Sequence, residues 1–225
     1  GGFLAYEVMF AESGEDGRPP SDAGAAETSD GTLGSLSRSL RAGREKKRKS
    51  AALTVEDARR AGVRFSEDGR VLVRYPKELR ANAFRIPDGV RIIGKDAFRG
   101  CLNLETVELP DGVIEIQQGA FFDCRNLRRI RFGAGLESIG AEAFARCARL
   151  KSPELPDTLR TIGAEAFSCC ESFESVRIPR GVTRIPAKAF FLCSALETVE
   201  LHEECRRIGA HAFLNCGRLR RLLPW

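Results

Sequence analysis

The sequence predicts an α/β solenoid, a stack of short coils in which each coil buries its apolar side against its neighbours. A 23-residue unit repeats six times without a gap, and many of its positions carry one residue type throughout. A fixed period of about 20–50 residues is typical of solenoid and array proteins. The units, numbered coils one to six below, are 86–108, 109–131, 132–154, 155–177, 178–200 and 201–223.

The constant positions of the unit predict its core. The eighth position is always isoleucine, the twelfth and thirteenth are always Ala-Phe, and the sixteenth is always cysteine. Identical positions stack about 4.8 Å apart along a parallel ladder. We therefore expect the repeated phenylalanine rings to form a stacked aromatic spine, which is the main apolar mass of the core.

Each coil is predicted to hold one short strand and one turn. The end of the unit alternates apolar and polar residues, as in Val107-Glu108-Leu109, and proline or glycine then ends the run. This pattern indicates a half-buried strand. The Ala-Phe segment suits a single helical or 3₁₀ turn on the opposite face. Pro153 lies within the strand of coil three and has no amide hydrogen for the ladder, so that strand should be bulged or shortened.

Residues 54–85 are predicted to cap the first coil. The run from Thr54 to Asp57 is a variant capping box that opens a short helix. The alternating residues 63–76 then predict a hairpin that turns at Asp68-Gly69.

Residues 1–53 are predicted to be a disordered tail. Residues 1–30 carry seven acidic side chains and one arginine, whereas 31–50 carry seven basic side chains and one glutamate. Such charge blocks are typical of disorder. The basic cluster 44–49 is either a solvated part of this tail or a nuclear-import or anion-binding segment. Because the chain begins without methionine and ends without a polar closing coil, we expect a fragment of a longer protein, or a partner over the last coil.

The repeat resembles a known family. The pattern Ile-Gly-x-x-Ala-Phe-x-x-Cys-x-x-Leu-x-x-Val-x-Leu-Pro, from Ile93 to Pro110, is similar to the BspA-like leucine-rich repeat. The resemblance covers 86–223 and implies a leucine-rich-repeat solenoid with an N-terminal hairpin-type cap. It further implies an interaction scaffold with no chemistry of its own. Members are known mainly as surface or adhesion-type proteins.

The cysteines and histidines do not predict a reactive centre. Six of the eight cysteines occupy the sixteenth position among core residues, which favours a ladder of reduced thiols over disulfides. Cys169 should face outward and is the better candidate for a reactive thiol. His202 and His211 fall on different corners of coil six, so zinc binding is not expected. We predict no catalytic, cofactor or metal site, and therefore no enzyme.

Two surface clusters are candidate binding sites. Arg128, Arg129 and Arg131 form a basic cluster on the strand face. On the opposite face, an apolar cluster follows the repeated phenylalanine and marks an interface if its side chains are exposed rather than rolled inward. Its members are Phe191, Leu192 and Leu214.

The favoured hypothesis is a non-enzymatic scaffold that binds a protein partner through the solenoid surface. The alternative is binding of nucleic acid or an anionic membrane through the basic tail cluster and the basic strand-face cluster. Self-association through the last coil is a further hypothesis. No signal peptide or transmembrane segment is visible in the sequence. The reduced-thiol pattern favours an intracellular location, whereas the family resemblance leaves the cell surface open.

Overall fold

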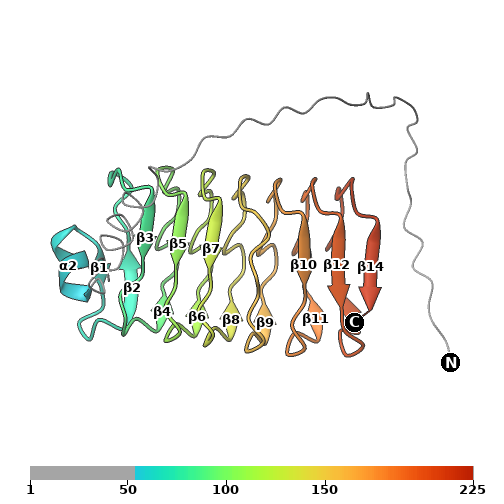
Figure 1. Cartoon of the computed structure of the whole chain (residues 1–225), viewed down its shortest axis with the longest axis horizontal. Coiled ribbons are helices and arrows are strands. Elements are labelled where there is room, and N and C mark those ends of the chain that lie inside the picture. Colours follow the sequence, from blue (N-terminus) through green and yellow to red (C-terminus); the bar gives the residue numbers. More distant parts are fainter. Residues whose placement is uncertain (1–53, 225) are drawn as a thin grey trace, which may run out of the picture. The chain divides into compact units, whose positions relative to one another are not determined.

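Two rows of short strands run along the repeats in the computed structural model, which describes residues 54–224 (Figure 1). The first row contains strands of three or four residues: β3 (Ala83–Arg85), β5 (Thr106–Glu108), β7 (Arg129–Arg131), β10 (Ser175–Arg177), β12 (Thr198–Leu201) and β14 (Arg221–Pro224). The second row starts at β2 (Val71–Arg74) and continues in two-residue strands: β4 (Ile92–Ile93), β6 (Glu115–Ile116), β8 (Ser138–Ile139), β9 (Thr161–Ile162), β11 (Arg184–Ile185) and β13 (Arg207–Ile208). The predicted solenoid of parallel short strands is confirmed.

The strands pair in the register that the repeat imposes. In the first row, Phe84 pairs with Val107 and Val107 with Ile130. In the second row, the repeated isoleucines pair with one another from Ile93 to Ile162. A slip of one residue would turn every buried side chain outward, so the apolar columns hold this register.

The second row of strands is an addition to the single strand per coil expected from the sequence. Each of its members after β2 has only two residues: in β4, β6, β8, β9 and β11 one is partly or fully exposed and the other is a buried isoleucine, whereas both residues of β13 are exposed. Two residues are too few to show the alternation by which a strand is recognised. The hydrogen-bonded ladder between coils makes them strands, and a single unit does not reveal that ladder.

Pro153 interrupts the first row, as predicted. Coil three has no strand there, so β3-β5-β7 and β10-β12-β14 are separate sheets. The hydroxyl oxygen of Ser152 accepts hydrogen bonds from the amides of Glu174 and Ser175, at 2.9 and 2.8 Å. A side chain thus replaces the ladder acceptor where the strand is lost, and the stack continues.

The core is the predicted aromatic spine. Phe98, Phe121, Phe144, Phe167, Phe190 and Phe213 stack in order, with ring centroids 4.7–5.5 Å apart and interplanar angles below 10°. Tyr75 extends the spine into the cap, because its buried ring stacks on Phe98 at 5.0 Å. The cap therefore covers the first coil by continuing its core.

The Ala-Phe segment forms consecutive turns rather than the single helical or 3₁₀ turn expected. The eleventh and fifteenth positions of the coils have φ near +60°, as at Asp96, Glu142, Cys169 and Leu192. Left-handed residues interrupt a helix. The amides at these positions instead bond to the next coil, for example Leu192 N to Leu214 O at 2.9 Å. The segment thus supplies a third line of hydrogen bonds between coils.

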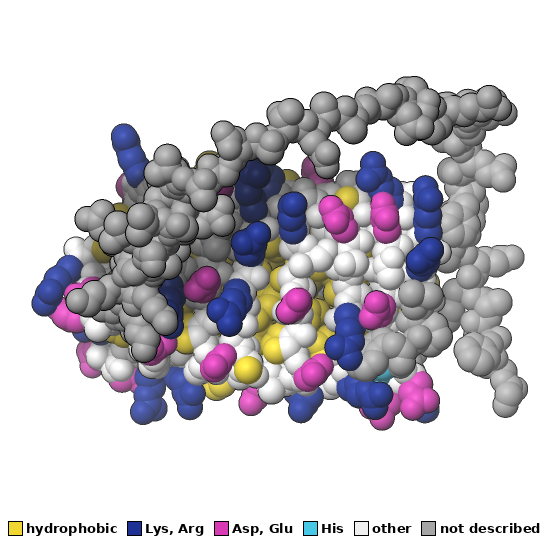
Figure 2. Space-filling model, viewed as in Figure 1, with side chains coloured by type: hydrophobic (Ala, Val, Ile, Leu, Met, Phe, Trp, Pro, Cys, Tyr) yellow, Lys and Arg dark blue, Asp and Glu magenta, His cyan; other side chains and the backbone are white. Residues whose placement is uncertain are grey.

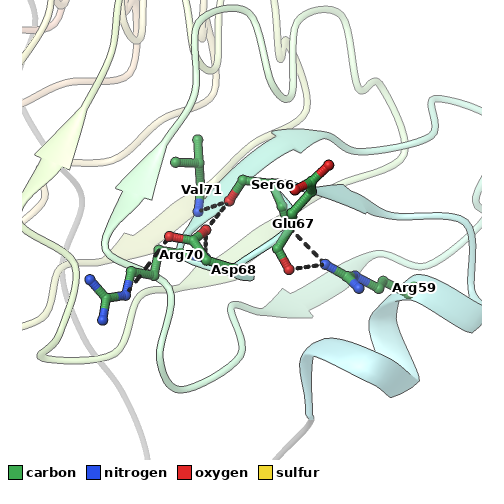
Figure 3. A network of polar contacts seen from close by, with 6 residues as sticks. All are labelled: Arg59, Ser66, Glu67, Asp68, Arg70 and Val71. Carbon is green, nitrogen blue, oxygen red and sulfur yellow. Dashed lines mark hydrogen bonds and ion pairs between the residues drawn. The ribbon is translucent and has the colours of Figure 1, made fainter.

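The cap consists of α2 (Val55–Arg60) and an antiparallel hairpin of β1 (Arg64–Phe65) and β2. A capping box joins Thr54 and Asp57 and lowers the pKa of Asp57. Figure 3 shows the hairpin turn, where the Ser66 hydroxyl donates to Asp68 at 2.6 Å and lowers the pKa of Asp68. Arg59 of α2 donates to the Ser66 carbonyl at 2.7 Å. These bonds fasten the helix to the hairpin.

Candidate protein-binding surfaces

The basic cluster lies where the sequence places it, at β7 of coil two. Arg129 and Arg131 are exposed on either side of buried Ile130. Arg128 is also exposed, but its Nε lies 3.6 Å from Glu105 Oε2 of the preceding coil. The strand register also sets Arg131 beside Glu108. Acidic neighbours therefore reduce the positive potential of this cluster, which weakens it as a site for anions.

Figure 2 shows charges of both signs distributed over the strand-bearing face, with hydrophobic side chains visible between them. The register pairs Arg177 with Glu200, as it pairs Arg131 with Glu108. Opposite charges on adjacent strands attract by about 0.2–1 kcal/mol per pair. This arrangement stabilises the stacking of the coils and produces no broad field of one sign in the described region.

The apolar cluster is partly exposed. Leu192 and Leu214 have exposed fractions of 38% and 46%, and Phe191 is intermediate. Leu192 and Leu214 belong to adjacent coils, five and six. Their backbones are directly joined, since the amide of Leu192 donates to the carbonyl of Leu214 at 2.9 Å. Leu192 has a left-handed backbone, with φ of 58°. Its side chain is exposed and is not rolled into the core. The structure thus brings the two leucines together at the surface.

A related aromatic position in coil two has a different environment. Phe122 occupies the same position of the repeat as Phe191, and the guanidinium carbon of Arg99 lies 4.2 Å from its ring centroid. Arg146 of the following coil lies 5.5 Å from the same centroid. Cation–π contacts of this kind shield an aromatic face from other partners. Phe122 is therefore a weaker candidate contact than the leucines of coils five and six.

The cysteine ladder has a structural role that the sequence did not reveal. From coil two onward, each repeated thiol donates to the carbonyl of the phenylalanine 26 residues earlier, at Sγ–O distances of 3.0–3.3 Å. Burial raises the pKa of Cys101 to about 12 and that of Cys216 to about 11, and it raises the pKa of Cys147, Cys170 and Cys193 strongly. These thiols stay protonated at neutral pH and suit a core rather than nucleophilic chemistry.

The other candidate reactive residues are spread over the solenoid. Cys169 is half-buried, with its Sγ 3.6 Å from the Ser168 hydroxyl. His202 is buried, and its Nε2 lies 3.1 Å from the carbonyl of Val182. Among residues 54–224, no group of three or more His, Cys, Asp or Glu side chains could hold a metal ion. Within the same range no helix is long and apolar enough to span a membrane.

The chain is a leucine-rich-repeat solenoid, as its two rows of stacked parallel strands and its aromatic spine define it. The profile of the BspA type leucine rich repeat region matches six copies, over residues 77–152 and 123–223, and so covers more than half of the chain. The chain belongs to the BspA-type leucine-rich repeat family. No curated protein sequence matches it.

Solved structures agree with this assignment. A leucine-rich repeat protein of T. pallidum is 26% identical with a TM-score of 0.57, over 70% of this chain and 87% of that one. A leucine-rich repeat protein from Bacteroides ovatus is 32% identical with a TM-score of 0.60, over 70% of this chain and 44% of that one. The pneumococcal vaccine antigen PcpA is 26% identical with a TM-score of 0.58, over 62% and 35%. This chain thus spans less than half of the latter two.

Proposed function

We propose that this protein is a non-enzymatic scaffold that binds a protein partner through the apolar cluster of Phe191, Leu192 and Leu214. The family is consistent with a protein-interaction scaffold. The observation that carries the proposal is the pair of exposed leucines on adjacent coils, beside a half-buried phenylalanine. Contiguous exposed apolar side chains on a soluble surface typically mark an interface.

The geometry of the cluster suits a rigid contact. Leu192 and Leu214 project from turns that are hydrogen-bonded to each other. A surface that is ordered before binding loses less conformational entropy when the partner docks. An apolar anchor on the partner could pack between the two leucines, with polar contacts around them.

The test is affinity capture with the L192S/L214S variant. Both side chains are well exposed, so the double substitution should leave the core and the free energy of unfolding nearly unchanged. We expect the variant to lose the protein partners that the wild-type chain captures. The apparent affinity for an isolated partner should fall by about tenfold or more, since hot-spot truncation typically costs at least about 2 kcal/mol.

The matched control is Leu102→Ser, which removes an equally exposed leucine (49%) from coil one. Capture by this variant should equal that of the wild-type chain. Equal capture by all three proteins would refute the apolar cluster as the binding surface. Loss in both variants would show a general effect of surface hydrophobicity instead of a site.

Binding of an anionic polymer through Arg128, Arg129 and Arg131 is the second candidate, because Arg129 and Arg131 are exposed on one strand. It requires an affinity that falls steeply with salt, by nearly one power of salt concentration for each phosphate contacted. Salt-insensitive binding would exclude it. The basic tail cluster 44–49 lies outside the described residues.

Self-association through coil six is a separate hypothesis. Ile208, Leu214 and Leu222 of that coil are exposed. Sedimentation of the L192S/L214S variant, which changes Leu214 of this coil, tests the hypothesis.

A further inference from the structure

A seam separates coils four and five in the second row of strands. The β9 strand pairs only with β8, and β11 pairs only with β13, so no ladder joins β9 to β11. The coils stay together on both sides of this gap. Glu165 N donates to Ala187 O at 3.1 Å, and Glu197 N donates to Glu174 O at 2.8 Å. The separation is therefore local.

Pro186 explains the seam. In the other five coils the residue after the repeated isoleucine is glycine or Gln117, and its amide donates to the preceding coil at 2.7–2.9 Å. Proline has no amide hydrogen, so the carbonyl of Ile162 loses this donor. The glycines also allow close approach, since a Cβ at Gly163 would lie 2.2 Å from the amide nitrogen of Ala141. A pyrrolidine ring in this place holds the coils apart.

The seam leaves backbone donors available. In coils one to four, the amides at the sixth and seventh positions both donate to the preceding coil, for example Arg160 N and Thr161 N to Glu137 O at 2.8 and 3.2 Å. The equivalent amides of coil five are those of Thr183 and Arg184. Within residues 54–224 neither of them donates to a backbone carbonyl of coil four. In the described part of the chain, these two adjacent N–H groups therefore lack the ladder bond, as does the Arg160 carbonyl that would accept it, and Thr183, Arg184 and Arg160 all line the cleft at the seam.

The residues around the opening are half basic or polar and half apolar. A cleft of about 410 Å³ lies at the seam, and its lining contains two arginines, two threonines and no carboxylate: Arg160, Thr161, Ile162, Ala164, Thr183, Arg184, Pro186 and Ala187. The nearby carboxylate of Glu165 is paired with Lys188 Nζ at 3.3 Å. Arg160 donates from Nη1 to the carbonyl of Asp157 at 3.1 Å, which leaves its other guanidinium donors for a ligand.

We infer that this cleft binds a tetrahedral oxyanion, a phosphate or sulfate group that is either free or carried on a larger molecule. Adjacent backbone amides combined with arginine and hydroxyl donors form the usual receptor for such groups. The carbonyl of Ile162 can accept from a protonated phosphate or from a hydroxyl of the molecule that carries the group. The site depends on Pro186, because a closed ladder would consume both amides.

The experiment is calorimetric titration of the full chain with inorganic phosphate, inorganic sulfate and a monosaccharide phosphate, in chloride buffer. We expect saturable binding by the wild-type chain, and about a hundredfold weaker binding by R160A/R184A, since each of the two arginines supplies a charge-assisted hydrogen bond that contributes roughly a factor of ten. Pro186→Gly should restore the ladder, raise the melting temperature and weaken binding by a similar factor. Arg91→Ala removes the arginine at the position of coil one that corresponds to Arg160, where the ladder is closed, and this variant should bind as the wild-type chain does.

The affinities of the three probes distinguish a carried group from a free anion. Tighter binding of the sugar phosphate identifies a carried group, and equal binding identifies a free anion. No saturable binding of any probe by the wild-type chain overturns the inference. Unchanged binding by a folded R160A/R184A variant, or by a folded Pro186→Gly variant, overturns it as well. If Pro186→Gly does not fold, which circular dichroism would reveal, the arginine variant alone decides.

Discussion

Replacing Phe144 with alanine should lower the free energy of unfolding by about 3–5 kcal/mol, the usual cost of truncating a buried phenylalanine. The ring is fully buried and lies between Phe121 and Phe167, at 5.1 and 5.4 Å. It also meets Phe132 edge-on at 5.8 Å. The substitution removes three aromatic contacts and leaves a cavity in the middle of the spine. Urea denaturation followed by circular dichroism measures the loss.

The control is the same substitution at the end of the spine. Phe213 is only partly buried, and among residues 54–224 its ring stacks on Phe190 alone, at 5.5 Å. Phe213→Ala should therefore cost about 1–2 kcal/mol, because less apolar surface returns to water. Phe144→Leu should fall between the two, since leucine refills part of the cavity. An equal loss at Phe144 and Phe213 would contradict the view that the spine carries the stability of the stack.

The interior of this protein was predictable because one 23-residue period governs it. When Ile93, Ala97 and Phe98 recur at the same interval, the stacking geometry requires each column to face the same way. The aromatic spine, the buried thiols and the defect at Pro153 all follow from that requirement. Tyr75 lies 23 residues before Phe98, but the pair Arg74-Tyr75 stands in a predicted hairpin and replaces the repeated Ala-Phe, so the sequence did not show Tyr75 as a member of the spine.

Features that depend on hydrogen bonds between coils were not predictable in the same way. The two-residue strands, the left-handed turns and the thiol bonds each join neighbouring coils, so no single unit displays them. The substitution of Pro186 for glycine is visible in the sequence, but its consequence depends on the bond that glycine makes elsewhere. The exposure of Leu192 likewise depends on a positive φ that a leucine rarely adopts. The repeat therefore predicted which residues form the apolar cluster, but it did not predict whether their side chains are exposed.

Alkaline pH should unfold the solenoid through its buried thiols. Burial keeps Cys101, Cys147, Cys170 and Cys193 protonated, with pKa values raised above the ordinary 9.0, whereas the unfolded chain titrates near that value. Above pH 9 the folded state thus holds more protons than the unfolded state, so stability falls as pH rises. The loss is about 1.4 kcal/mol per thiol per pH unit, and on the order of 5 kcal/mol for the four between pH 8 and pH 10.

Urea midpoints measured between pH 7.5 and pH 10.5, with a reductant to prevent oxidation, give this slope. Cys147→Ala should be less stable than the wild-type chain at pH 7.5, because the buried thiol packs and donates to Phe121 O at 3.2 Å. It should nevertheless lose less stability on going to pH 10, by about the contribution of one thiol. Cys169→Ser, which removes a thiol outside the ladder, controls for the number of cysteines. A stability that stays constant from pH 8 to pH 10 would show that the thiols ionise as readily in the folded stack as in the unfolded chain, and the cysteine ladder would then not be the dry core that its burial indicates.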